Sequence, residues 1–179
     1  NTIVEKKGTY PYPISPFSGV VDPIDPDMVA EVVEAALKES SLNGADIIVT
    51  FESAGAQLAA VVGLALHLPY LVARKKKFNL KHEISFAVET NFDEKYFHVY
   101  GDVKGKKILI VDDVVASGAT IKNATLAFRK AGATVLALFV VAAKTNIIGR
   151  KYQDLLNDID VPLLSLIKIK VADGRVVVF

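Results

Sequence analysis

Two adjacent carboxylates and a short hydroxyl-bearing loop form the part of the chain with the clearest chemistry. Asp112 and Asp113 end an apolar run, and the loop 116–120 that follows contains a glycine and two hydroxyl side chains. Backbone N–H groups at a helix start, the close approach that glycine permits and hydroxyl donors all suit a phosphate. The two carboxylates would repel a phosphate, but they can accept charge-assisted hydrogen bonds from vicinal hydroxyls. A ribose 5-phosphate would satisfy both halves of the segment; a carboxylate pair that merely caps a helix is the alternative.

The elements around this segment follow a regular alternation. Continuous apolar runs alternate with segments of helical period, which is typical of a parallel sheet covered on both faces. Strands are predicted at 46–51, 70–74, 107–112, 135–142 and 163–170. Helices are predicted at 27–40, 54–66, 119–131 and 149–156. Ligands of open parallel sheets bind beyond the carboxyl ends of the strands, which is where the two carboxylates are expected.

Two regions depart from the alternation. Residues 9–26 contain five prolines, a density that excludes a central strand or a regular helix and predicts an irregular cap over the sheet edge. Residues 75–100 are polar and contain two weak strands at 84–88 and 96–99. A loop of this length inside a compact domain is usually functional, often as an active-site lid. We therefore expect a single domain over 1–179, with a cap at 9–26 and a flexible lid at 75–100.

Composition excludes several other functions. The 179 residues are 51% hydrophobic, which suits one domain with a full-sized core, and a net charge of +1 argues against a dedicated nucleic-acid binder. The chain has no cysteine, which excludes disulfides and thiol chemistry and fits a cytoplasmic protein. The apolar stretch 56–72 is interrupted by His67 and Pro69 and is too short to span a membrane. A glycine-rich dinucleotide motif and histidines at metal-ligand spacing do not occur, so neither an oxidoreductase nor a metallohydrolase is supported.

The segment 108–120 resembles the signature with which type I phosphoribosyltransferases bind 5-phosphoribosyl 1-diphosphate (PRPP). In that signature apolar residues precede an Asp-Asp pair and a Thr-Gly-x-Thr loop follows; Ser117 takes the place of the first Thr here. The segment 49–55 is similar to the family's diphosphate loop, and 71–75 to the Ile-Arg-Lys strand end of adenine phosphoribosyltransferases. The opening with Ser18-Gly-Val-Val21 and the tail 166–178 resemble archaeal purine phosphoribosyltransferases, among them hypoxanthine enzymes.

The resemblance implies a fold and a reaction. The fold would be the type I phosphoribosyltransferase fold, an α/β architecture with a mostly parallel central sheet, helices on both faces, a small hood from both termini and a mobile lid. The enzyme would be a glycosyltransferase (pentosyltransferase) in which a base nitrogen displaces diphosphate from ribose C1. The transition state is oxocarbenium-like, so electrostatic stabilisation should dominate. A closing lid would exclude water from the same carbon. Family members are usually homodimers, and neither nucleic acid nor a membrane is implied as a partner.

The resemblance also implies a role for each part of the site. Asp112 and Asp113 would hold the ribose hydroxyls. The ribose 5-phosphate would be bound by Asp112, Asp113, Val115, Ala116, Ser117, Gly118, Ala119 and Thr120. The diphosphate would face Glu52, Ser53, Ala54, Gly55, Arg74, Lys75 and Lys77. Mg²⁺ would arrive with PRPP, because this ion prefers phosphate and hydroxyl oxygens plus water to an all-protein cage. No direct protein ligand of the metal is therefore expected.

The lid is the part in which this sequence departs from the family. Asn79 stands where a lysine is common, and Lys81-His82 where Pro-Gly is usual. Lys76 or Lys77 could substitute in the diphosphate contact, in the same subunit or across a dimer interface. Adenine enzymes carry a lid glutamate that helps proton transfer at the base. Glu89 is the preferred candidate and Glu94 the other, with a solvated surface position as the alternative for both.

The identity of the base rests on features that point in different directions. Hypoxanthine-guanine enzymes place an Asp at the position of Ala116, where adenine enzymes place Ala, as here. Lys144 stands where 6-oxopurine enzymes carry a lysine that reads O6, with a solvated strand-end lysine as the alternative. Phe17 and Val21 could sandwich the base or be ordinary packing. We favour conversion of adenine and PRPP to AMP and diphosphate in purine salvage. A 6-oxopurine enzyme is the first alternative, and a non-catalytic PRPP- or nucleotide-sensing regulator is the second.

Overall fold

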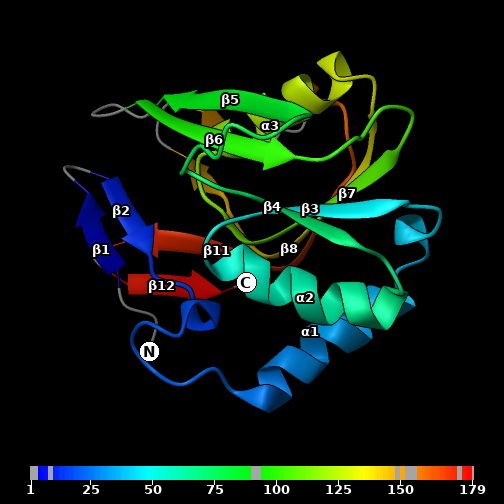
Figure 1. Cartoon of the computed structure of the whole chain (residues 1–179). Helices are drawn as coiled ribbons and strands as arrows, with labels where there is room; N and C mark the ends of the chain where they lie inside the picture. The colour runs from blue at the N-terminus through cyan, green and yellow to red at the C-terminus, as the bar shows by residue number, and fades with distance from the viewer. Residues whose placement is uncertain are drawn as a thin grey trace.

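A mostly parallel sheet forms the centre of the protein (Figure 1). The computed structural model describes residues 4–7, 10–89, 94–147, 150–151, 157–172 and 175–178. Within these residues the central sheet has six strands in the order β12-β11-β8-β7-β3-β4. Their bounds are β3 (Ile47–Phe51), β4 (Tyr70–Ala73), β7 (Lys107–Val115), β8 (Thr134–Lys144), β11 (Leu163–Ala172) and β12 (Arg175–Val178). Neighbouring strands pair in parallel except β12, which is antiparallel to β11.

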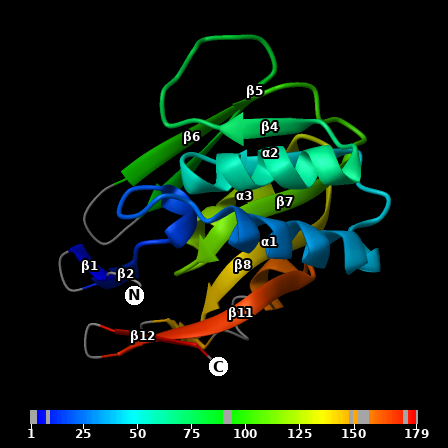
Figure 2. The same cartoon turned by 90° about the horizontal axis from the view of Figure 1, so that it is seen from below.

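Helices cover both faces of the sheet, as the alternation of apolar runs predicts (Figure 2). The helices are α1 (Pro26–Lys38), α2 (Ala54–Leu66) and α3 (Ala119–Lys130). One apolar core joins α1 and α2 to one face through residues such as Leu58, Val62 and Phe139. The other core lies on the opposite face and joins α3 to residues such as Val49, Ile110 and Leu138. No helix in the described part of the chain is long and apolar enough to cross a membrane.

A β-hairpin completes the face that α3 covers. Strands β5 (Glu83–Glu89) and β6 (Glu94–Tyr100) pair antiparallel in full register and lie across the sheet from α1 and α2 (Figure 1). Phe86 stacks on Phe97 at a centroid distance of 5.7 Å, and Phe97 meets the edge of Phe51 at 5.8 Å. The two weak strands predicted within 75–100 are therefore present. Their apolar side chains belong to the core and touch the last residue of β3.

The remaining short elements lie at the chain termini and in connections. They are β1 (Val4–Lys7), β2 (Tyr10–Pro13), η1 (Pro16–Ser18), η2 (Ser40–Leu42), β9 (Asn146–Ile147) and β10 (Arg150–Lys151). The hairpin of β1 and β2 lies beside β11 and β12 in both views (Figures 1 and 2). The proline-rich segment thus contributes no central strand, in agreement with its composition.

Most predicted boundaries agree with the structure, and two do not. The bounds of α2 match, and Gly132 follows α3 with a φ of 83°, the left-handed conformation expected after a helix end. Strand β7 continues to Val115, so both carboxylates lie inside the strand rather than at its end. The predicted helix at 149–156 is wrong at Arg150–Lys151, which pair with β9 as a strand, and its other residues lie outside the described part.

Truncation of Phe86, an aromatic residue of the hairpin, tests whether the hairpin belongs to the core. Phe86→Ala should lower the free energy of unfolding by about 3–5 kcal/mol, because a buried ring leaves a cavity. Leu126→Ala on α3 is the control; its side chain is 51% exposed, and its loss should change stability by about 0.5 kcal/mol or less. Urea denaturation of both variants measures the difference. Equal costs would show that the hairpin is not part of the core.

Candidate active site

The predicted site residues meet at the carboxyl edge of the sheet because parallel strands end together there. Phe51 pairs with Ala73, and Val115 pairs with Ala143. The residues after these pairs are Glu52, Arg74, Ala116 and Lys144. Four connections from different parts of the sequence are therefore side by side at one edge, as the topology of a parallel sheet requires.

Asp112 and Asp113 are both half-buried in the last part of β7. The backbone N–H of Asp113 donates to Asp112 Oδ1 at 3.0 Å, so the first carboxylate folds back on its own strand. Burial raises the pKa of Asp112 well above its usual value, and the negative charge of Asp113 adds to the effect. The pair is rich in acceptor oxygens, and the ionised form of Asp112, which the fold disfavours, would gain from hydroxyl donors.

The N-terminus of α2 packs against this carboxylate, and a glycine makes the approach possible. A Cβ on Gly55 would lie 2.5 Å from Thr50 Oγ1 and 2.7 Å from Asp112 Oδ1. Such contacts are shorter than packing allows, so no side chain fits at this position. Thr50 is fully buried, and its hydroxyl has no hydrogen-bond partner among the described residues. A buried polar atom of this kind, next to the carboxylate pair, was missed by sequence reasoning because threonine is common in strands.

The loop between β7 and α3, where a phosphate is predicted to bind, ends in a glycine with a left-handed conformation. Gly118, the N-cap residue just before α3, has a φ of 77°, in the left-handed region that favours glycine. The Ser117 hydroxyl accepts from the N–H of Ala119 at 3.3 Å, and Gly118 itself provides no side-chain cap. The first turn of α3 contains no acidic residue that would compete with an anion.

The turn between β3 and α2 brings the predicted diphosphate residues together. The Glu52–Ser53 peptide bond is cis, and Glu52 N donates to Ala73 O at 3.1 Å. Arg74 Nη1 lies 3.9 Å from Glu52 Oε2, and Lys75 Nζ lies 3.8 Å from Glu52 Oε1. The two cations that follow β4 therefore converge on the turn that opens α2.

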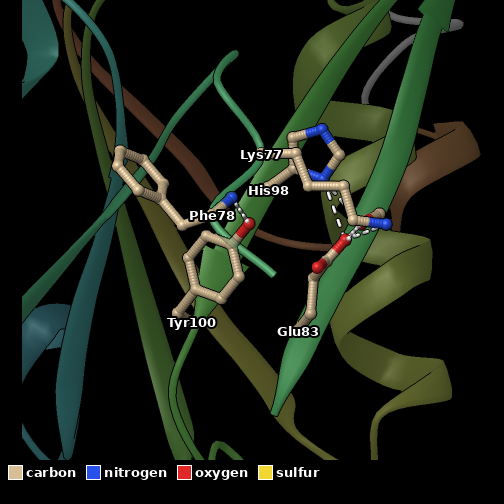
Figure 3. Close-up of polar contacts among 6 residues, drawn as sticks. Lys77, Phe78, Glu83, His98 and Tyr100 are labelled. Atoms are coloured by element: carbon tan, nitrogen blue, oxygen red, sulfur yellow. Dashed lines mark hydrogen bonds and ion pairs between the residues drawn. The ribbon is translucent and has the colours of Figure 1, made fainter. Parts of the chain in front are cut away.

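Lys77 is placed differently from Arg74 and Lys75. Its Nζ lies 3.4 Å from Glu83 Oε1, in a cluster at the base of the hairpin (Figure 3). The same oxygen is 3.1 Å from His98 Nδ1, and Ser85 Oγ donates to it at 2.6 Å. The hydrogen bond from Ser85 holds the pKa of Glu83 below its usual value, with further help from His98 and Lys77 against the opposing effect of burial. Lys77 is thus anchored to the hairpin through Glu83.

A second contact fixes the neighbouring residue to the same hairpin. The backbone N–H of Phe78 donates to the Tyr100 hydroxyl at 2.6 Å, and the two rings meet edge to face (Figure 3). The segment that follows Arg74 and Lys75 is therefore attached to β5 and β6 at two points. Sequence reasoning missed Glu83, His98 and Tyr100, whose partners are distant in sequence or become adjacent only when the hairpin forms.

The residues predicted to surround the base differ in their exposure. Lys144 is fully buried at the end of β8, beside Ile169 of β11 in the ladder, and this burial lowers the pKa of its amine. The alternative of a solvated strand-end lysine is therefore wrong. Phe17 is buried in the core that α1 and α2 cover, whereas Val21 is 47% exposed. Glu89 and Glu94 occupy paired positions at the hairpin end, and their side chains lie outside the described part.

Comparisons with known proteins agree on one family. The family model described as "Phosphoribosyl transferase domain" matches residues 24–170. A hypoxanthine/guanine phosphoribosyltransferase of Methanotorris igneus is 33% identical over 173 residues, covering 97% of this chain and 92% of that protein. An "HGPRTase-like protein 2" of Natrialba magadii is 34% identical over 176 residues, covering 98% and 93%. The structure of an adenine phosphoribosyltransferase from Thermoanaerobacter pseudethanolicus matches with a TM-score of 0.69, 23% identity and coverage of 87% and 93%.

The raised pKa of Asp112 predicts a stabilising variant. The folded state keeps this proton at pH values where the unfolded chain has lost it, so the contribution of Asp112 to stability falls as pH rises from about 3.8 through the folded pKa. Asp112→Asn should therefore raise the free energy of unfolding by about 1 kcal/mol at neutral pH. The gain should shrink towards pH 4.

Urea denaturation at the two pH values checks this, with the exposed carboxylate of Asp22 replaced by Asn as the control. A destabilised Asp112→Asn protein at neutral pH would contradict the assignment of Asp112 as a group whose ionised form the fold disfavours.

Proposed function

The chain belongs to the phosphoribosyltransferase family, and we propose that it is a purine phosphoribosyltransferase that acts on a 6-oxopurine such as hypoxanthine or guanine. The observation that supports this base is the complete burial of Lys144 at the strand end next to the phosphate loop. A lysine buried at the end of a strand beside the predicted ligand-binding edge is uncommon, and its lowered pKa makes it a candidate for a functional role. A 6-oxopurine offers a carbonyl oxygen to such a donor, whereas adenine offers an amino group there. The names of the relatives from Methanotorris igneus and Natrialba magadii agree with this base.

Adenine is the second candidate, and Ala116 favours it. The family resemblance places Ala at this position in adenine enzymes and Asp in hypoxanthine-guanine enzymes. The structural likeness to adenine enzymes, at 23% identity, adds only the fold. Sequence reasoning preferred adenine because Lys144 could equally have been solvated. The burial of that lysine reverses our preference.

The residues at this edge of the sheet would have distinct roles in the reaction. Asp112 and Asp113 would accept hydrogen bonds from the ribose hydroxyls and orient C1 towards the base. Backbone N–H groups of the loop 116–120 would hold the 5-phosphate. Arg74 and Lys75 would stabilise the charge that develops on the leaving diphosphate. The exposed residues 75–82, between β4 and the hairpin, would close over the site and exclude water.

The residues present fit a Mg²⁺ ion that enters with PRPP. The half-buried carboxylates of Asp112 and Asp113 are hard oxygen donors that favour a nearby divalent cation. PRPP would carry the ion into the site, where the charge of Asp112 and Asp113 would help to hold it. When bound, Mg²⁺ would neutralise part of the diphosphate charge.

A base panel tests the preferred base. Purified protein with PRPP and Mg²⁺ should convert hypoxanthine or guanine to the nucleotide, and Lys144→Met should reduce this turnover about 100-fold. Methionine removes the buried charge and keeps a similar length, so the fold should persist. The control is Lys130→Met, an exposed lysine on α3.

Turnover of adenine, unchanged in Lys144→Met, would establish the second candidate. PRPP binding without turnover of any base would support the sensing regulator.

Removal of both carboxylate charges tests the ribose assignment. Asp112→Asn combined with Asp113→Asn should abolish PRPP binding, because each charge-assisted hydrogen bond contributes about 1.5–3 kcal/mol. Calorimetric titration with PRPP and Mg²⁺ measures the loss, and circular dichroism checks the fold. Unchanged PRPP affinity in the double variant would refute the role of the pair.

A further inference from the structure

Glu52 is an unexpected residue at the place where a diphosphate would bind. It occupies the turn that opens α2, between the end of β3 and Ser53. Its side chain is a carboxylate, and its backbone N–H already donates to Ala73 O. Glu52 therefore has no hydrogen-bond donor to offer a diphosphate, and its charge would repel one. Its position in the diphosphate loop needs another explanation.

The contacts of the Glu52 carboxylate supply this explanation. Its two oxygens face different cations, Arg74 at 3.9 Å and Lys75 at 3.8 Å. Both cations are about half exposed, at 50% and 54%, whereas the Glu52 side chain is 23% exposed. Both distances are long for ion pairs, so the contacts are weak and readily exchanged. The carboxylate of Glu52 thus forms weak ion pairs with both cations that a diphosphate would need.

We propose that Glu52 is an internal competitor of the diphosphate. In the absence of substrate it pairs loosely with Arg74 and Lys75, the two cations that the diphosphate would need. When diphosphate binds, the two cations change partner, and the nearby carboxylate weakens the hold on the anion. Glu52 is thus a positioning residue that limits product affinity and promotes release. This inference rests on the proposed function, because it takes the diphosphate as the anion at this turn.

Binding of inorganic diphosphate tests the proposal directly. Glu52→Gln keeps the size of the side chain and removes its charge, so the dissociation constant for diphosphate with Mg²⁺ should fall about tenfold at low ionic strength. The gain should shrink at high salt, because the repulsion it removes is screened. Isothermal titration calorimetry measures both values. In steady-state assays, product inhibition by diphosphate should strengthen by a similar factor.

Glu34→Gln is the matched control. Glu34 also carries an ion pair, with Lys38 on α1, and the substitution makes the same charge change on an exposed surface. It should leave diphosphate affinity unchanged within about twofold. Thermal unfolding confirms that both variants are folded. An equal gain in the two variants would show a general effect of net charge and would overturn the proposal.

A double-variant cycle separates exchange of partners from simple repulsion. In an Arg74→Gln background, Glu52→Gln should improve diphosphate binding clearly less than in the wild type, because one of the two competed cations is gone. The same gain in both backgrounds would refute the exchange. Weaker binding of diphosphate in the presence of Mg²⁺ by the Glu52→Gln variant alone would show that Glu52 assists the ligand. That result would also refute the proposal.

The failure of this proposal and that of the proposed function are distinguishable. Unchanged diphosphate affinity in an enzyme that turns over PRPP would refute the role of Glu52 alone. A clear gain in Glu52→Gln, in a protein that turns over no base, would support the role of Glu52 and refute the enzymatic function.

Discussion

The close approach of α2 to the strand ends sets the geometry on which the rest of the site depends. Gly55 leaves no room for a side chain between Thr50 and Asp112, so the first turn of the helix rests on the end of β3 and on the neighbouring strand β7. The turn between β3 and α2 and the carboxylate of Asp112 are thereby held close together. A ligand that spans a ribose and a diphosphate needs this separation to be constant, and a packed contact provides it better than flexible loops do.

The hairpin connects this rigid edge to the apolar core and to the segment that would cover the substrate. Phe97 touches Phe51, the residue before Glu52. Where β5 begins and β6 ends, Glu83 contacts Lys77 and Tyr100 accepts a hydrogen bond from Phe78. Arg74 shares a backbone bridge with His98 of β6. The cations that face the diphosphate turn are therefore positioned from two directions, by the sheet through β4 and by the hairpin through β6. Between β4 and the hairpin, residues 75–82 are exposed and can move without disturbing the core.

Local patterns in the sequence predict the layers of this fold well and its long-range contacts poorly. The apolar runs of β3 and β8 and the amphipathic α3 are evident because burial imposes their periodicity. The end of β7 is not evident from the sequence, because two acidic residues interrupt the apolar pattern of the strand. The burial of Lys144 and the pairing of Lys77 with Glu83 depend on strands that become neighbours only in the fold. Phe17 is buried in the core because η1 packs on α2, which the proline pattern does not reveal.

Two charged groups at this edge are held in surroundings that disfavour their charge. Burial raises the pKa of Asp112 and lowers that of Lys144, so each group weakens the fold in its ionised state. Substrate hydroxyls would stabilise the carboxylate, and a base carbonyl would accept from the ammonium. Part of the free energy that the burial of Asp112 costs would then be recovered on binding, which would couple substrate affinity to stability. Under the proposal for Glu52, its loose pairs with Arg74 and Lys75 would act in the opposite sense, because a bound diphosphate would compete with them for the two cations. The site would then combine groups that gain from the substrate with one group that competes with it. Such an arrangement suits an enzyme that must bind its substrate firmly and still release its products.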